Sequence, residues 1–283
     1  MRKKGFTTEE ILSQSNGRLT LCEIHERLKE LIYFFDQFCK TNSLTYYPAG
    51  GTLIGTIRHN GFIPWDDDVD FYMPREDYEK LIKYSQITKD IDVVTRFCGD
   101  KYYHPFQHCN LSDKKTIFVS HLLRWNTGKG QYIDIFPLDN VPDNDTEKEK
   151  LMRKLYNDCR ICSYSVAAKR KGGTLKDSGI RFVSSVLSHA NIEGVLDRID
   201  KTAQSYNSIS CKRWGPISRE ARDRLVWDKD WFTSTFRHEF EDIEIDVPIG
   251  YDSILRHTFG DYMQLPPENQ RGNQHEIDVY WRK

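Results

Sequence analysis

The 283-residue chain has neither a long apolar segment nor a recognisable export signal. No run approaches the ~18 consecutive apolar residues that a membrane-spanning helix needs. The first ten residues, MRKKGFTTEE, begin with basic side chains, but the apolar segment of a secretory signal does not follow. These absences predict a cytoplasmic protein without a transmembrane helix.

The chain also lacks an excess of charge of either sign. It contains 41 Lys and Arg against 42 Asp and Glu, which leaves a formal net charge of −1. Proteins that bind nucleic acid duplexes normally carry a basic excess. We therefore expect no nucleic-acid partner.

The seven cysteines are odd in number and scattered, which is typical of reduced thiols rather than a disulfide framework. Cys159 and Cys162 have a spacing found in zinc sites, and further ligands could come from Cys98, His104, His108 and Cys109. However, the segment around Cys159 and Cys162 has a helical pattern rather than the turn of a zinc knuckle. Ordinary thiols are therefore the favoured interpretation, with a structural zinc as the alternative.

Apolar periodicity predicts an α/β protein with a mixed sheet in its first half. Residues 20–42 should form a helix, because Thr20 and Glu23 fit a capping box. The further helices and strands expected up to residue 140 are strands at 45–49, 67–72, 91–97, 115–120 and 131–136, and helices at 52–59 and 74–85. Beyond residue 140 the pattern becomes mostly helical, over 151–190, 192–205 and 249–259. We therefore expect a core at 1–140, and a helical cap with a C-terminal tail at 141–283 that completes the active site.

A dense group of carboxylates stands in the segment Trp65-Asp66-Asp67-Asp68-Val69-Asp70. On a strand, Asp66, Asp68 and Asp70 would share one face and Asp67 would point the other way. Like charges this close need a counter-ion, and Mg²⁺ prefers hard oxygen ligands of this kind. An EF-hand starting at Asp66 would need Gly at its sixth position, where the chain has Phe71, so that calcium site is excluded. A solvated acidic strand remains the alternative.

Asp134 is the expected partner of this group. It is the acid of the otherwise apolar strand Tyr132-Ile133-Asp134-Ile135-Phe136, where an unpaired carboxylate would be costly. We predict Asp68, Asp70 and Asp134 as catalytic residues, and the same three with Asp66 as ligands of Mg²⁺ or Mn²⁺. Asp134 could also accept the proton of an attacking hydroxyl.

Gly50, Gly51 and Thr52 precede the short helix that ends with Arg58 and His59. Backbone N–H groups at such a turn suit a phosphate, and glycine permits close approach. We predict these five residues to bind the phosphates of a substrate. The pattern as a whole indicates metal-assisted phosphoryl transfer.

Three blocks of the sequence resemble the LicD family, which includes the fukutin-related proteins. They are GGTLIGTIRHNGFIPWDDDVDFYMPREDY (50–78), YIDIFPLD (132–139) and FGDYMQLPPENQR (259–271) with His275. The resemblance implies a nucleotidyltransferase core of the DNA polymerase β type, with its Gly-Gly turn at Gly50-Gly51, its paired acids at Asp68 and Asp70, and its third acid at Asp134. It also marks Arg271 and His275 as substrate-binding candidates.

The resemblance further implies a reaction. Bacterial members move phosphocholine from CDP-choline to a hydroxyl of a cell-surface glycan precursor, such as teichoic acid, lipopolysaccharide or capsule, and release CMP. Eukaryotic relatives transfer ribitol phosphate, so another CDP-linked alcohol such as ribitol or glycerol phosphate is the alternative. A non-catalytic subunit of glycan assembly is a third possibility. The glycan acceptor can be lipid-linked. For the basic block at 151–190 a solvated helix face is the favoured interpretation, with peripheral contact with the inner membrane surface as the alternative.

Overall fold

The computed structural model describes residues 5–166, 191–272 and 277–283. Its longer helices are α1 (Thr8–Leu12), α2 (Leu21–Thr41), α3 (Gly50–His59), α4 (Arg75–Leu81), α5 (Asp145–Val166), α7 (Ile192–Ala203) and α8 (Tyr251–Phe259). Short 3₁₀ turns are η1 (Gln204–Tyr206), η2 (Asp223–Leu225), η3 (Lys229–Phe232) and η4 (Glu268–Gln270). The strands are β1 (Ser15–Arg18), β2 (Tyr47–Pro48), β3 (Asp70–Pro74), β4 (Gln86–Thr88), β5 (Ile91–Val94), β6 (Cys109–Asp113), β7 (Thr116–Ser120), β8 (Tyr132–Val141), β9 (Arg213–Gly215), β10 (Trp227–Asp228), β11 (Thr235–Phe240), β12 (Ile243–Pro248) and β13 (Ile277–Arg282).

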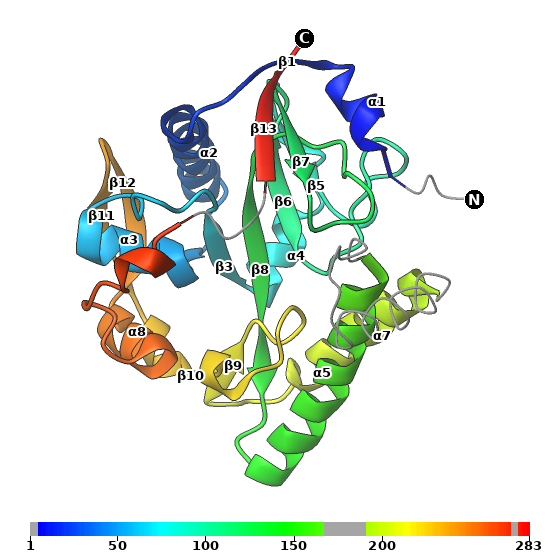
Figure 1. The fold of residues 1–283 in the computed structure, drawn as a ribbon. Coiled ribbons are helices and arrows are strands. Elements are labelled where there is room, and N and C mark those ends of the chain that lie inside the picture. The colour runs from blue at the N-terminus through cyan, green and yellow to red at the C-terminus, as the bar shows by residue number, and fades with distance from the viewer. Residues whose placement is uncertain (1–4, 167–190, 273–276) are drawn as a thin grey trace.

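A mixed sheet of eight strands forms the centre of the molecule (Figure 1). Its main path runs β10-β9-β8-β6-β5-β4, and β3 adds to β8 in parallel. β8 is the longest strand, and it pairs with β6 and β3 along its first half and with β9 at its end. The expected α/β fold with a mixed sheet is therefore confirmed.

Helix α2 covers this sheet, and its sequence explains why. Thr20 and Glu23 form the predicted capping box, which satisfies backbone N–H groups at the start of the helix. Leu28, Leu31 and Phe35 recur on one face and are fully buried in the main core. The helix thus begins within a residue or so of its predicted position and packs as its periodicity indicates.

The second half is not mostly helical, so that expectation is wrong. Strands β9 and β10 extend the central sheet, and β11 and β12 form a separate hairpin. The hairpin turn is Glu241-Asp242, in which Glu241 has a φ of 55°. This turn lacks the glycine or asparagine that normally signals a hairpin in sequence. The division at residue 140 stays a prediction, although the sheet itself runs across it.

Helices α5 and α7 pack on each other beside the end of β8 and build a second apolar cluster. Ion pairs of one arginine connect these two helices to the core. Arg75 of α4 donates to both carboxylate oxygens of the buried Asp139 on β8, at 2.7 and 2.6 Å. Arg75 also contacts Asp200 of α7 at 3.1 Å. The basic block at 151–190 lies on α5 only as far as Val166, and its remainder is outside the described residues.

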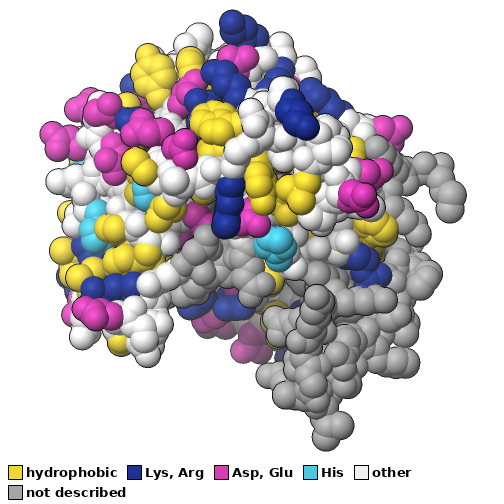
Figure 2. Space-filling view, turned by 45° about the horizontal axis from the view of Figure 1, so that its top comes forward, with side chains coloured by type: hydrophobic (Ala, Val, Ile, Leu, Met, Phe, Trp, Pro, Cys, Tyr) yellow, Lys and Arg dark blue, Asp and Glu magenta, His cyan; other side chains and the backbone are white. Residues whose placement is uncertain are grey.

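Among the described residues, no helix has both the length and the apolar character required to cross a membrane. On the face in Figure 2, acidic and basic side chains are interspersed over the described part of the surface. This distribution agrees with the balanced charge of the sequence.

Candidate active site

The acidic segment lies immediately before β3 rather than within it. β3 begins at Asp70, three residues later than predicted, so strand parity does not apply to residues 66–68. Side-chain oxygens of Asp66, Asp67 and Asp68 lie within 4.8 Å of one another. The prediction that Asp67 points away from the other two is therefore wrong, because residues 66–69 are not part of a strand and the alternation of side chains along a strand does not apply to them.

The backbone of this segment is held from two sides. Nε2 of His25, on α2, lies 2.7 Å from the carbonyl oxygen of Asp66. The His25 ring stacks on Phe62 with ring centres 4.3 Å apart, which fixes its position. From the other side, the Gln131 amide donates to the carbonyl oxygen of Asp67 at 3.1 Å. The acidic segment is thus attached both to α2 and to the residue that precedes β8.

Asp70 and Asp134 lie opposite each other on the neighbouring parallel strands β3 and β8. The N–H of Asp134 donates to the carbonyl oxygen of Val69 at 2.9 Å, and the N–H of Asp70 donates to the hydroxyl oxygen of Thr52 at 2.9 Å. Three predicted site residues, Thr52, Asp70 and Asp134, are therefore brought together. Their catalytic and binding roles remain predictions.

The Gly-Gly pair forms the first turn of α3 instead of a separate turn before it. Gly50 has a φ of 50°, in the left-handed region that favours glycine. A Cβ at Gly51 would lie 2.8 Å from Oδ2 of Asp66, and one at Gly50 would lie 3.8 Å from Oδ2 of Asp70. The helix start thus contacts the acidic segment directly, and its unpaired backbone N–H groups stand beside the carboxylates.

The carboxylate oxygens of Asp66, Asp67 and Asp68 are a donor set that fits a hard divalent cation. Asp70 and Asp134 are the next carboxylates along the same edge of the sheet. The four-residue ligand set expected from sequence differs from this cluster, because it omitted Asp67 and included Asp70 and Asp134, which are not among the three clustered carboxylates.

A buried network of polar side chains contacts the carboxylate of Asp134. His108 Nε2 lies 3.1 Å from Oδ1 of Asp134, which also accepts a hydrogen bond from the Asn110 amide. Lys129 donates to Asn110 Oδ1, and its ammonium lies 3.2 Å from the centre of the Tyr132 ring. Burial alone would raise the pKa of Asp134, but His108 and Lys129 hold it well below its usual range. Burial lowers the pKa of Lys129 to about 7.

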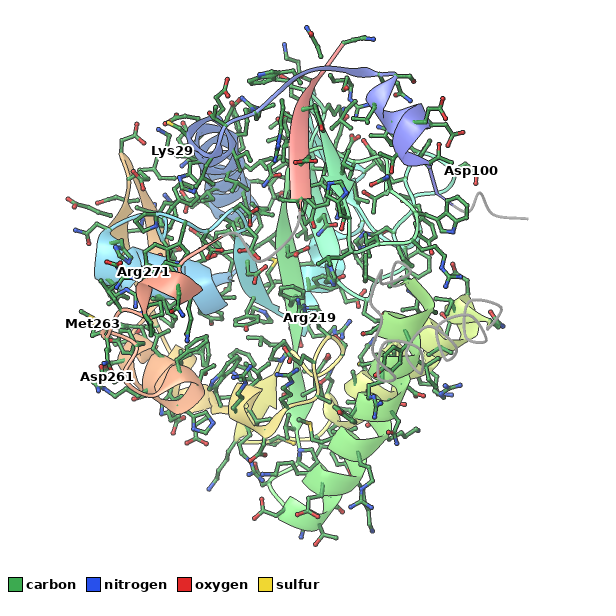
Figure 3. The ribbon with its side chains drawn as sticks, in the orientation of Figure 1. Lys29, Asp100, Arg219, Asp261, Met263 and Arg271 are labelled. Carbon is green, nitrogen blue, oxygen red and sulfur yellow. The ribbon has the colours of Figure 1, made fainter. Side chains whose placement is uncertain are left out.

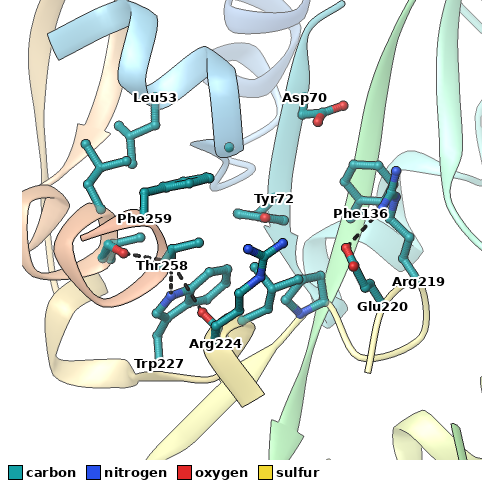
Figure 4. A pocket seen from close by; sticks show the side chains of 15 residues that line it. Leu53, Asp70, Tyr72, Phe136, Arg219, Glu220, Arg224, Trp227, Thr258 and Phe259 are labelled. Carbon is teal, nitrogen blue, oxygen red and sulfur yellow. Dashed lines mark hydrogen bonds and ion pairs between the residues drawn. The ribbon is translucent and has the colours of Figure 1, made fainter. Parts of the chain in front are cut away.

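Beside Asp70 is a cavity of about 140 Å³, which we call the first cavity (Figure 4). Gly50, Asp70 and Tyr72 line one side, and the aromatic rings of Trp227 and Phe259 line another. Figure 4 shows the Arg224 guanidinium pointing toward Tyr72. Trp227 is held in place because its indole N–H donates to the hydroxyl oxygen of Thr258 at 3.0 Å. The first cavity therefore combines cationic groups with aromatic walls next to the acidic edge.

Arg219 is a site residue that sequence reasoning missed. It belongs to the loop between β9 and η2, and its guanidinium carbon lies 4.7 Å from the centre of the Phe136 ring. Figure 3 shows it beside β8. Burial lowers the pKa of Arg219, but the carboxylates of Asp70 and Asp134 raise it overall. No motif signals this residue, because only the pairing of β9 with β8 carries its loop to the carboxylates.

The predicted residues Arg58, His59 and Arg271 form a separate basic cluster. Arg58 donates to His59 Nε2 at 3.0 Å and to the carbonyl oxygen of Tyr262 at 2.7 Å. Arg271, which Figure 3 shows on the α3 side of the molecule, places its guanidinium carbon 5.6 Å from the centre of the Trp65 ring. The cluster attaches α3 to the C-terminal tail. Arg58, His59 and Arg271 are not among the residues that line the first cavity. His275 lies outside the described residues.

The parallel strands β3 and β8 carry facing acids beside the glycine-rich start of α3. Residues 43–166, which contain these elements, match the family model described as LicD/FKTN/FKRP, nucleotidyltransferase domain. The chain is similar over 93% of its length, at 27% identity, to the lipopolysaccharide cholinephosphotransferase LicD of Haemophilus influenzae, of which it covers 98%. It is 47% identical over 103 residues to an uncharacterized protein of Rickettsia prowazekii, which is 36% of this chain and 35% of that protein. It is also 34% identical over 62 residues to mannosyltransferase regulator 4 of Saccharomyces cerevisiae, which is 22% of this chain and 5% of that protein.

Proposed function

We propose that this protein is a Mg²⁺-dependent transferase that moves phosphocholine from CDP-choline to a hydroxyl of a cell-surface glycan precursor and releases CMP. The observation that carries the proposal is the pairing of Asp70 with Asp134 beside the Gly50-Gly51 helix start. The near full-length similarity to a lipopolysaccharide cholinephosphotransferase supports the choice of donor.

In the proposed reaction the first cavity receives the nucleotide part of the donor. Arg219 and Arg224 bring positive charge to the phosphates, and the Tyr72 and Trp227 rings offer flat surfaces to the cytosine. The backbone N–H groups at the start of α3 bind a phosphate oxygen. These groups hold the pyrophosphate next to the carboxylates.

Asp66, Asp67 and Asp68, with Asp70 and Asp134, would hold the cation, which supplies neutralisation of phosphate charge when it is bound. Contacts with His108 and Asn110 orient the Asp134 carboxylate and favour its ionised form. Asp134 therefore acts in the proposal as a fixed negative charge, oriented by His108 and Asn110, rather than as the main proton acceptor.

We place the reaction in the cytoplasm, on a glycan or lipid-linked glycan acceptor such as a lipopolysaccharide, teichoic acid or capsule precursor. Seven free cysteines support a reducing compartment. Peripheral contact with the inner membrane surface stays part of the proposal.

The direct test is CMP release. CDP-choline, Mg²⁺ and a lipopolysaccharide preparation that lacks phosphocholine are incubated with the protein, and CMP is followed by chromatography while choline incorporation is followed by mass spectrometry. We expect CMP and labelled glycan in equal amounts, and loss of both with EDTA. CDP-choline that neither binds nor turns over with any acceptor would contradict the proposal.

A second candidate donor is another CDP-linked alcohol, such as CDP-ribitol or CDP-glycerol. Two guanidinium groups line the first cavity. Because they are positively charged, they favour the CDP part that all three donors share over the cationic choline group. A thermal-shift panel with the three donors discriminates, because the true ligand gives the largest stabilisation. A non-catalytic role in glycan assembly would instead be favoured if Asp70→Asn left glycan decoration in cells unchanged.

A further inference from the structure

A second cavity, of about 210 Å³, lies on the other side of β8 from the first. It is bounded by residues 105–108, by α5 and α7, and by Ser218 and Arg219. Arg219 lines both cavities. In Figure 1, α8 and β10 lie on one side of β8, and α5 and α7 lie on the other. The two cavities therefore approach the Asp70–Asp134 edge from different directions.

The wall of the second cavity contains an unsatisfied hydroxyl. Ser218 is 1% exposed, and its Oγ has no hydrogen-bond partner among the described residues. The Oγ has almost no accessible surface, so a ligand in the cavity reaches it only when the Ser218 side chain rotates. Because a buried polar group without a partner is costly, a hydrogen bond to a ligand hydroxyl favours that rotation.

The remaining walls suit a ring that is apolar on one face and polar at its edge. The Phe106 ring stacks on His108, with ring centres 5.2 Å apart. Leu196 and Ile199 add apolar surface from α7. The Gln107 amide is held because it donates to the carbonyl oxygen of Leu196. Sugars have this combination, with C–H groups that pack on an aromatic ring and hydroxyls at the edge.

The cavity also leads to the catalytic edge. His108 lines it, and Nε2 of His108 lies 3.1 Å from Oδ1 of Asp134. In phosphoryl transfer the attacking and leaving oxygens lie roughly in line on opposite sides of phosphorus. A donor in the first cavity would thus leave the second cavity for the attacking group.

We propose that the second cavity binds the acceptor sugar ring. This proposal rests on the proposed function. The sugar hydroxyl oxygen forms a bond to the donor phosphorus that carries the alcohol. At the same time the bond from that phosphorus to the bridging oxygen breaks, CMP leaves with the electron pair, and the hydroxyl proton passes to water. Arg219, at the boundary of both cavities, lies where it can contact the transferred phosphoryl group.

The test fills the cavity from its rim. Ser163 is exposed on α5 and lines the second cavity, so Ser163→Trp places a large ring at its mouth. Phe106→Leu removes the aromatic face and keeps an apolar side chain. Asn157→Trp is the matched control, since Asn157 is also exposed on α5 but lies outside the cavity lining. Binding of methyl glycosides of glucose, galactose and N-acetylgalactosamine is measured by ligand-observed NMR, and CDP-choline affinity by calorimetry.

We expect at least one glycoside to bind the wild type and the Asn157→Trp control, and at least tenfold weaker binding to Ser163→Trp and Phe106→Leu. The Kd of CDP-choline should change less than twofold in all variants. The proposal is overturned if no glycoside binds the wild type, if both cavity variants bind as the wild type does, or if Ser163→Trp weakens CDP-choline instead. The glycoside measurement needs no donor, so absence of CMP release from every CDP-linked donor would contradict the proposed function separately.

Discussion

At the scale of single residues, Gly51 is the point where α3 meets the acidic segment. A Cβ there would lie 2.8 Å from Oδ2 of Asp66. Because the far end of the Asp66 side chain can move, we expect Gly51→Ala to fold normally but to bind Mg²⁺ at least tenfold more weakly. The measurement is a Mg²⁺ titration of CMP release together with thermal melting.

Gly55 is the matched comparison on the same helix. Its Cβ would lie 2.5 Å from the backbone carbonyl oxygen of Gly61, which cannot move freely. Gly55→Ala should therefore lower the free energy of unfolding by about 1–3 kcal/mol. Equal loss of stability in both variants would show that Gly51 is structural and not part of the binding site.

Asp70→Asn keeps the size of the side chain and removes its charge. We expect CMP release to fall at least a hundredfold because one carboxylate of the proposed cation site is gone, while the protein stays folded at room temperature. Circular dichroism and a turnover assay measure the two effects. Unfolding of this variant at room temperature would point to a structural role for Asp70 instead.

At the scale of elements, the buried pair of Arg75 and Asp139 connects α4 to β8. Asp139 is fully buried, and its remaining side-chain donor is the Asn207 amide at 2.8 Å. Arg75→Met would leave a buried carboxylate without its cation, which costs about 3–5 kcal/mol. Urea unfolding checks this value. Arg256→Met, which breaks an exposed pair with Asp252, should change the free energy of unfolding much less than Arg75→Met does.

Asp36 connects α2 to the β11–β12 hairpin. Tyr46 donates to Asp36 at 2.6 Å and Arg237 at 2.7 Å. Burial raises the pKa of Asp36, but these hydrogen bonds and that of Lys40 lower it below 3.8 overall. The stabilisation that the ionised Asp36 contributes is therefore fully present above a pH of 3.8, and it is lost as the pH falls through the folded-state pKa of this group.

Asp36→Asn should accordingly destabilise the protein by about 1–3 kcal/mol at pH 7. Because wild-type Asp36 is itself protonated in acid, the difference between the two proteins should shrink below a pH of 3.8. Urea unfolding between pH 7 and pH 3 provides the test. Asp242→Asn, which removes an acidic side chain from the exposed turn of the same hairpin, is the control. A difference that stays constant over this range would contradict the ion-pair explanation.

At the scale of the whole molecule, cation binding should stabilise the fold. A ligand at a hundred times its Kd adds about 2.7 kcal/mol to the free energy of unfolding. We expect Mg²⁺ to raise the melting temperature of the wild type, and Asp68→Asn to lose most of this shift. Asp100→Asn is the control, since Asp100 is an exposed residue near α1 (Figure 3). An unchanged shift in Asp68→Asn would remove this residue from the cation site.

Local patterns in the sequence predicted much of the first half. The capping box at Thr20 located α2, and the lone acid of a buried strand, Asp134, proved to lie opposite Asp70. Strand parity failed at Asp67 because this residue precedes β3, which begins only at Asp70. Arg219 could not be predicted, since a loop arginine carries no periodic or motif signal. The β11–β12 hairpin was missed because its turn uses glutamate and aspartate.

The pairing of β1 with β13 has a consequence for how the protein folds. Ser15 lies beside Arg282, and β13 also pairs with β7, so the sheet that contains these strands joins distant parts of the chain. Contacts between residues so far apart in sequence form slowly. During synthesis on a ribosome, β1 and β7 emerge long before β13 and must wait for it with unpaired edges. In an incompletely synthesised chain, β1 and β7 therefore expose unpaired strand edges that can aggregate.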